Sequence, residues 1–163
     1  MANHYQRSDL WIGWAGALIT SGTARDVRWL TLRELRLGSV ALPLTRTLFT
    51  RVALTYGFIP VPFDRSELEG HALAVRSALR QLDAGETIGW FPEGRRGHSR
   101  GLSPALPHSD RFAALLARQA PLVPAAVWED CGRLTVRFGP AIDENQIAGG
   151  DLMAHLAALL PDA

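Results

Sequence analysis

The stretch that organises this sequence is Phe91-Pro92-Glu93-Gly94-Arg95-Arg96-Gly97-His98-Ser99-Arg100. It follows an apolar run, residues 86–91, which predicts a short buried strand. Pro92 and Gly94 end this strand, because proline cannot donate to a sheet ladder and both residues favour turns. The resulting loop carries one carboxylate, Glu93, beside arginines suited to binding a phosphate or carboxylate. From this stretch alone, an anion site and an ordinary solvated charge cluster remain equal alternatives.

The composition predicts a globular protein with one domain over residues 1–163. Hydrophobic residues make up 47% of the chain and charged residues 20%, which is typical of a chain that buries a core. The formal net charge of +1 argues against a dedicated nucleic-acid binder, so any anion site must be local. The single cysteine, Cys131, excludes an internal disulfide framework and a cysteine-based zinc site.

No segment of the sequence predicts a signal peptide or a membrane span. The longest uncharged run extends from Leu10 to Ala24 and is interrupted by glycines. It is shorter than the roughly 18–20 apolar residues that a spanning helix requires. We therefore expect a chain that is not integral to a membrane by its own sequence.

Strand and helix patterns alternate along the chain. Strands or extended segments are predicted at 26–32, 58–62, 86–91, 122–128 and 133–138, and helices at 10–19, 43–56, 66–85, 109–119 and after residue 151. This alternation predicts an α/β layered fold with a largely parallel or mixed sheet flanked by helices.

Several predicted helices carry start and stop signals. Pro43 suits a first helical turn, and Gly57 suits a helix end. Residues 66–69, Ser-Glu-Leu-Glu, predict a capping box, and Ser109 and Asp151 are further candidate caps. The helix behind the capping box is expected to turn one apolar face inward, formed by Leu68, Ala72, Val75, Leu79 and Leu82.

His4 and Asp9 form a candidate pair near the start of the chain. On an ideal helix their offset turns about 500°, which leaves the two side chains about 140° apart. They converge if His4 lies in a loop and Asp9 begins a helix. Asp9 then holds the imidazole Nδ1–H and leaves Nε2 as a general base. From this pair alone, two unrelated surface residues remain the more frequent explanation.

Four segments taken in order resemble the glycerolipid acyltransferases, the family of glycerol-3-phosphate and lysophosphatidate (1-acylglycerol-3-phosphate) acyltransferases. The family's first motif, Asn-His-x4-Asp, is similar to residues 3–9, and its second, a glycine and apolar run ending in arginine, to residues 57–65. The third, Phe-Pro-Glu-Gly-Thr-Arg-Ser, resembles residues 91–97, and the fourth, an apolar Val-Pro segment, residues 122–126. Order and spacing agree, and the resemblance spans residues 3 to about 138.

The resemblance implies direct acyl transfer in phospholipid biosynthesis. His4, oriented by Asp9, would deprotonate a hydroxyl of a lysophospholipid or glycerol phosphate, which attacks the thioester of acyl-CoA or acyl-carrier protein. No cofactor, metal or covalent acyl-enzyme is expected. The implied acceptor and phosphate site consists of Arg65, Glu93, Gly94, Arg95 and Arg96. Val123 and Pro124 are expected to shape the acyl site.

The sequence also departs from the family pattern. Arg95 stands in the place of a threonine and Gly97 in that of a serine, so the third motif is more basic than usual. A lysine common between the first two motifs appears as Leu32, with Arg33 adjacent. The family usually has a membrane-associated segment before the first motif, which this chain is expected to lack.

We therefore expect a cytoplasmic protein that contacts the inner face of the membrane peripherally, with Trp11 and Trp14 as the first candidate contacts. An alternative is a catalytically impaired lipid- or phosphate-binding module on the same fold. The enzyme is favoured by four intact residues: His4, Asp9, Glu93 and Arg65. A hydrolase is less favoured, because Ser99 and Ser103 have no obvious base beyond nearby histidines.

Overall fold

The computed structural model describes residues 1–5, 11–33, 36–37, 40–41, 43–62, 66–94, 102–149 and 151–161. These residues group into two compact units, one made of residues 1–25 and 91–163 and the other of residues 26–90. The predicted α/β class is confirmed by strands and helices in both units. The prediction of a single domain over residues 1–163 stays a prediction.

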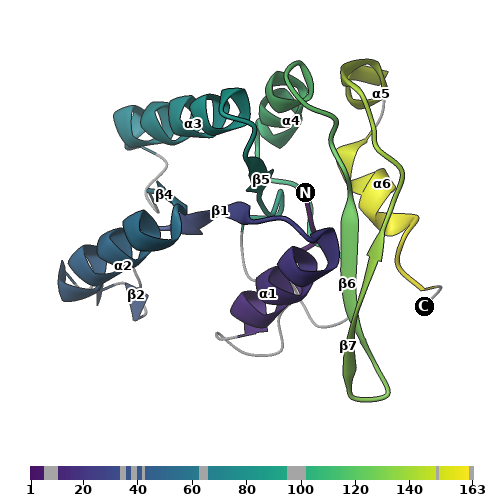
Figure 1. Ribbon diagram of the computed structural model, residues 1–163, viewed down its shortest axis with the longest axis horizontal. Coiled ribbons are helices and arrows are strands. Elements are labelled where there is room, and N and C mark those ends of the chain that lie inside the picture. Colours follow the sequence, from purple (N-terminus) through teal and green to yellow (C-terminus); the bar gives the residue numbers. More distant parts are fainter. Residues whose placement is uncertain are drawn as a thin grey trace. The chain divides into compact units, whose positions relative to one another are not determined.

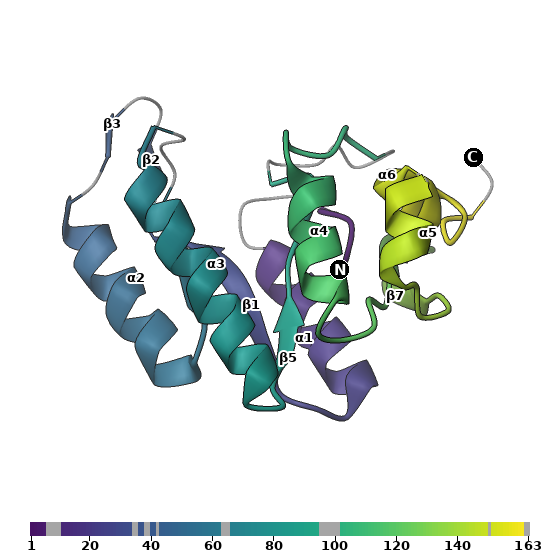
Figure 2. The same ribbon diagram turned by 90° about the horizontal axis from the view of Figure 1, so that it is seen from above.

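Residues 26–90 contain a three-stranded parallel sheet in the order β4-β1-β5 (Figure 1). Its strands are β1 (Val27–Leu32), β4 (Ile59–Val61) and β5 (Thr87–Gly89). Two helices, α2 (Pro43–Tyr56) and α3 (Leu68–Asp83), pack against this sheet (Figure 2). An antiparallel ribbon of β2 (Arg36–Leu37) and β3 (Val40–Ala41) was not predicted from the sequence.

A glycine permits close packing inside this sheet. A Cβ added at Gly89 of β5 would lie 2.7 Å from Val27 Cγ1 and 2.8 Å from Trp29 Cε3. Trp29 and Trp90 are both buried. The apolar runs that predicted β1 and β5 therefore do form the core of this unit.

The signals at both ends of α2 are confirmed. Pro43 is its first residue, and Gly57 follows its last with a φ of +68°. Arg28 Nη1 donates to the Tyr56 carbonyl at 3.0 Å, and Arg28 Nη2 pairs with Glu86 at 3.3 Å. The guanidinium thus supplies a donor to one of the carbonyls that a helix end leaves without an intrahelical partner.

The predicted capping box at the start of α3 is wrong. Glu67, not Ser66, is the N-cap residue, and its side chain makes no capping hydrogen bond. Both Glu67 carboxylate oxygens instead accept from Arg33 Nη2, at 2.7 and 2.6 Å. A hydrogen bond between two charged groups is stronger than a neutral cap, and Arg33 lies far away in the sequence.

The predicted inward face of α3 is also partly wrong. Leu68 is 75% exposed and Ala72 is exposed, whereas Ala74 and Ala78 are buried. The remaining three predicted residues, Val75, Leu79 and Leu82, are half-buried. Small side chains therefore form the buried centre of this helix face, and the larger residues flank it.

The unit formed by residues 1–25 and 91–163 is built on an antiparallel hairpin of β6 (Ala125–Asp130) and β7 (Arg133–Phe138) (Figure 1). Cys131 and Gly132 form its turn with φ angles of +47° and +78°. Helix α1 (Trp11–Thr23) packs against β7. A Cβ added at Gly22 would lie 2.9 Å from Phe138 Cε2, so this glycine permits the close approach.

Three shorter helices complete this unit: α4 (Ser109–Ala117), α5 (Glu144–Gly149) and α6 (Leu152–Ala157). The Asp151 cap is confirmed, because its carboxylate accepts from the Met153 amide at 2.9 Å. The Ser109 cap is wrong: His108 is the N-cap of α4, and the Ser109 hydroxyl donates to the Pro92 carbonyl at 3.1 Å. Helix α5 was not predicted.

Among the described residues, none of the helices is both long and apolar enough to cross a membrane.

Candidate active site

The first five residues extend the sheet of the β6–β7 unit. Ala2 forms a parallel bridge with Ala125 of β6. The Ala125 amide donates to the Met1 carbonyl at 2.8 Å, and the Met1 amino group donates to the Val123 carbonyl at 2.9 Å. Burial lowers the pKa of that amino group to about 5. The segment that carries His4 is therefore fixed against a strand rather than lying in a free loop.

Asn3 continues this ladder with its side chain. Its Nδ2 donates to the Val127 carbonyl at 2.9 Å, and its Oδ1 accepts from the Val127 amide at 2.6 Å. The carboxamide thus pairs with both main-chain groups of Val127, as a neighbouring peptide unit would. Asn3 is buried, and so is Val127.

His4 meets the third motif through its main chain and its ring. The His4 amide donates to Glu93 Oε1 at 2.6 Å, across 89 residues of sequence. The imidazole packs edge-to-face on Phe91, with ring centroids 5.4 Å apart and an interplanar angle of 73°. The structure therefore brings together the described parts of the first and third motifs, residues 3–5 and 91–94.

Glu93 is almost fully enclosed, at 1% exposure. Its second oxygen, Oε2, accepts from the Ser103 amide at 2.7 Å. Each carboxylate oxygen is thus bound to a main-chain N–H, and both distances are at the short end expected for a charged acceptor. The family resemblance implies that Glu93 belongs to the acceptor site, whereas its observed hydrogen-bond partners are main-chain amides.

Gly94 shapes the loop behind Glu93. Its φ of +57° lies in the left-handed region, and its amide donates to the Phe91 carbonyl at 3.0 Å. A Cβ at this position would lie 2.7 Å from Leu106 Cγ. Leu106 is itself held, because its amide donates to the Pro92 carbonyl at 2.8 Å. Glycine is therefore required here for both backbone conformation and space.

The residues predicted to shape the acyl site differ in exposure. Val123 is 40% exposed, whereas Pro124 is among the fully buried side chains. The Gly139 amide donates to the Pro124 carbonyl at 2.8 Å. Four predicted site residues lie outside the described part of the chain: Asp9, Arg65, Arg95 and Arg96.

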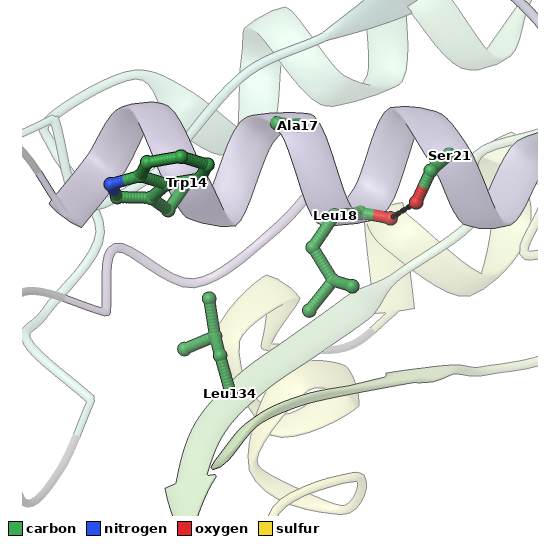
Figure 3. A pocket seen from close by; sticks show the side chains of 5 residues that line it. All are labelled: Trp14, Ala17, Leu18, Ser21 and Leu134. Atoms are coloured by element: carbon green, nitrogen blue, oxygen red, sulfur yellow. Dashed lines mark hydrogen bonds between the residues drawn. The ribbon is translucent and has the colours of Figure 1, made fainter. Parts of the chain in front are cut away.

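An apolar groove of about 460 Å³ lies on the same unit, between α1 and β7 (Figure 3). Its lining residues are Trp14, Ala17, Leu18, Ser21 and Leu134. Trp14 is 67% exposed, and the Ser21 hydroxyl donates to the Leu18 carbonyl at 2.8 Å. His4 and Glu93 do not line this groove.

Cysteine chemistry finds little support at Cys131. Asp130 raises the pKa of the exposed Cys131 thiol, first by a hydrogen bond and then by its charge. A higher pKa lowers the thiolate fraction, which disfavours this cysteine as a nucleophile. Within the described ranges, no cluster of three or more histidine, cysteine or carboxylate side chains is arranged to hold a metal ion.

Sequence reasoning assigned no role to Asn3 or Ser103. For Asn3 a signal was present, because it directly precedes His4 in the first motif. Ser103 acts through its main-chain amide, and nearly every residue type carries that group. Its contribution therefore leaves no signal in the sequence.

A model of the family described as Acyltransferase matches residues 1–128, which is 128 of the 163 residues. No curated protein and no solved structure matches the chain. The matched range contains His4, Glu93 and Gly94, and thus both segments that meet at the site. The chain therefore belongs to the acyltransferase family.

Proposed function

We propose that this protein transfers a fatty acyl group from the thioester of acyl-CoA or acyl-carrier protein to a hydroxyl of a lysophospholipid or glycerol phosphate. Membership of the acyltransferase family supports acyl transfer in general. The observation that most favours this site is the 2.6 Å hydrogen bond between the His4 amide and Glu93. It joins the histidine of the first motif to Glu93, the carboxylate of the third motif.

In the proposed reaction, His4 acts as a general base. Its Nε2 takes the proton from the acceptor hydroxyl as the hydroxyl oxygen attacks the thioester carbonyl carbon. The tetrahedral intermediate then collapses, the carbon–sulfur bond breaks, and the leaving thiolate takes the proton from the imidazolium. The products are an ester and a free thiol. Asp9 is proposed to hold Nδ1–H and so keep Nε2 as the base.

The acceptor's phosphate is proposed to bind to Arg65, Arg95 and Arg96. A guanidinium presents two parallel N–H donors that match two phosphate oxygens, so arginine suits this task better than lysine. Arg65→Ala should therefore raise the KM of the acceptor more than that of the thioester. Equal effects on both substrates, or no effect, would argue against phosphate recognition by this residue.

The reaction is tested by thiol release with a panel of thioesters and acceptors. Acyl-CoAs of several chain lengths and an acyl-carrier-protein thioester are each combined with lysophosphatidate, other lysophospholipids and glycerol 3-phosphate. We expect thiol release that depends on an acceptor, with the acylated acceptor detected by mass spectrometry. Acceptor binding without thiol release or product in any combination would instead indicate a binding module.

We also propose peripheral contact with the inner face of the membrane, because such an acceptor and product reside in a bilayer. Support comes from the exposed Trp14 and the apolar groove on α1 (Figure 3). Arginines close to an anionic membrane surface would add about 1 kcal/mol each. The expected result is co-sedimentation with anionic vesicles that weakens with salt and with Trp14→Ala. A protein that stays in the supernatant at both low and high salt contradicts this proposal.

A further inference from the structure

We propose that Asn3 and Glu93 are positioning residues that clamp the main chain at His4, and that Glu93 serves this task rather than binding the acceptor. The clamp consists of the Asn3 carboxamide on Val127 and the Glu93 carboxylate on the His4 amide. This inference rests on the proposed function, in which His4 is the base.

Glu93 has little access to a ligand. At 1% exposure, its carboxylate has almost no surface through which to reach a ligand. Its oxygens already accept N–H groups from His4 and Ser103, at 2.6 and 2.7 Å. An enclosed carboxylate with two main-chain donors joins three chain segments, because those donors lie 89 and 10 residues away in the sequence.

Asn3 is the residue immediately before His4. Its two hydrogen bonds require both an acceptor and a donor on one side chain, and they pair with both polar groups of one peptide residue, Val127. A one-residue slip of residues 1–5 along β6 would break both bonds. Asn3 therefore sets the register in which His4 meets Glu93.

The two contacts act at adjacent positions of the chain. Asn3 fixes the residue before His4, and Glu93 fixes the His4 amide itself. The direction of a side chain follows from its main chain, so both contacts orient the imidazole without touching the substrate. A misplacement of 1 Å in a catalytic group costs about 10²-fold in rate.

The kinetic test separates the two roles of Glu93. In Glu93→Gln, the amide group must face one of the two N–H donors, so at least one of the hydrogen bonds is lost. We expect kcat to fall at least about tenfold with the acceptor KM changed less than about twofold. Asn3→Ala should show the same pattern. Asp151→Ala, which removes the α6 cap in the same unit, is the control: its melting temperature should fall while kcat and KM stay unchanged.

Amide hydrogen exchange provides a readout that does not depend on activity. The His4 and Ser103 amides should exchange slowly in the wild-type protein and faster in Glu93→Gln, while the Val127 amide stays protected. In Asn3→Ala, the Val127 amide should lose its protection. If Glu93→Gln does not fold, Glu93→Asp keeps the charge on a side chain one methylene shorter and should show the same kinetic pattern.

A rise in acceptor KM at unchanged kcat in Glu93→Gln would overturn the inference, as would unchanged exchange at His4. The failure of the proposed function looks different. In that case the wild-type protein releases no thiol with any acceptor, while the exchange measurements still decide whether the two side chains hold the segment.

Discussion

Replacing Gly94 by alanine tests whether the loop behind Glu93 is constrained as the structure indicates. Gly94 has a φ of +57°, and an added Cβ would meet Leu106, with Cγ at 2.7 Å. Gly132, in the turn of the β6–β7 hairpin, is a matched control. It has a φ of +78°, but nothing lies within 4 Å of an added Cβ.

The two substitutions share one energetic cost and differ in another. A non-glycine residue in the left-handed region costs about 1–2 kcal/mol, and both variants incur this cost. Overpacking a tight site adds about 1–3 kcal/mol, which applies only to Gly94. We therefore expect a loss of unfolding free energy of about 2–5 kcal/mol for Gly94→Ala and about 1–2 kcal/mol for Gly132→Ala.

Urea denaturation at 25 °C measures both losses, and a double-mutant cycle assigns the excess to Leu106. In the Leu106→Ala background the clash is removed, so Gly94→Ala should cost no more than Gly132→Ala. The resulting coupling energy should be about 1 kcal/mol or more. Equal losses for the two single glycine variants, or a cycle without coupling, would refute the claim that Leu106 occupies the space beside Gly94.

Two further predictions concern the energetics of the fold. Arg33→Met breaks the ion pair with Glu67 and should lower the unfolding free energy by about 1 kcal/mol. The loss stays this small because Glu67 is partly exposed and remains hydrated. Arg118→Met breaks a more exposed ion pair and should change the unfolding free energy by less than about 0.5 kcal/mol. Equal losses for the two variants would contradict the expectation that the less exposed ion pair contributes more. Asp151→Ala should cost about 1 kcal/mol through loss of the α6 cap, measured as a lower urea midpoint at constant m-value. An unchanged midpoint would show that this cap contributes nothing.

Much of the fold could be predicted because its signals are local. The apolar runs at 26–32 and 86–91 predicted β1 and β5, and Pro43 and Gly57 marked both ends of α2. Each of these signals depends on what a residue or a short run can do by itself. Proline cannot continue a ladder, glycine accepts a positive φ, and a continuous apolar run favours burial.

The errors arose where a distant residue competes with a local pattern. The Ser-Glu-Leu-Glu sequence predicted a capping box, but Arg33, 34 residues earlier, binds Glu67 instead. Leu68 fits the apolar stripe of α3 and is nevertheless 75% exposed, because the sheet contacts a neighbouring stripe centred on alanines. Helical periodicity identifies candidate faces, but it does not determine which face the sheet covers.

For the candidate site, the residue types were identified and their roles were not. The resemblance placed His4 and Glu93 in one site, and the hydrogen bond between them is consistent with that. The contact uses the His4 main-chain amide, which no side-chain pattern predicts. Asn3 was visible in the first motif, but its pairing with Val127 depends on the strand that packs beside it.

The most direct test of acyl transfer by His4 is acceptor-dependent thiol release by His4→Ala, with His155→Ala on α6 as the matched control. Both are measured in a Cys131→Ser background, since the exposed thiol would react with the detection reagent. We predict that His4→Ala lowers kcat by about 10²–10⁴-fold, the range expected for loss of a general base. His155→Ala should leave kcat unchanged. Thiol release by His4→Ala at the rate of the control would contradict the assignment of His4 as the base.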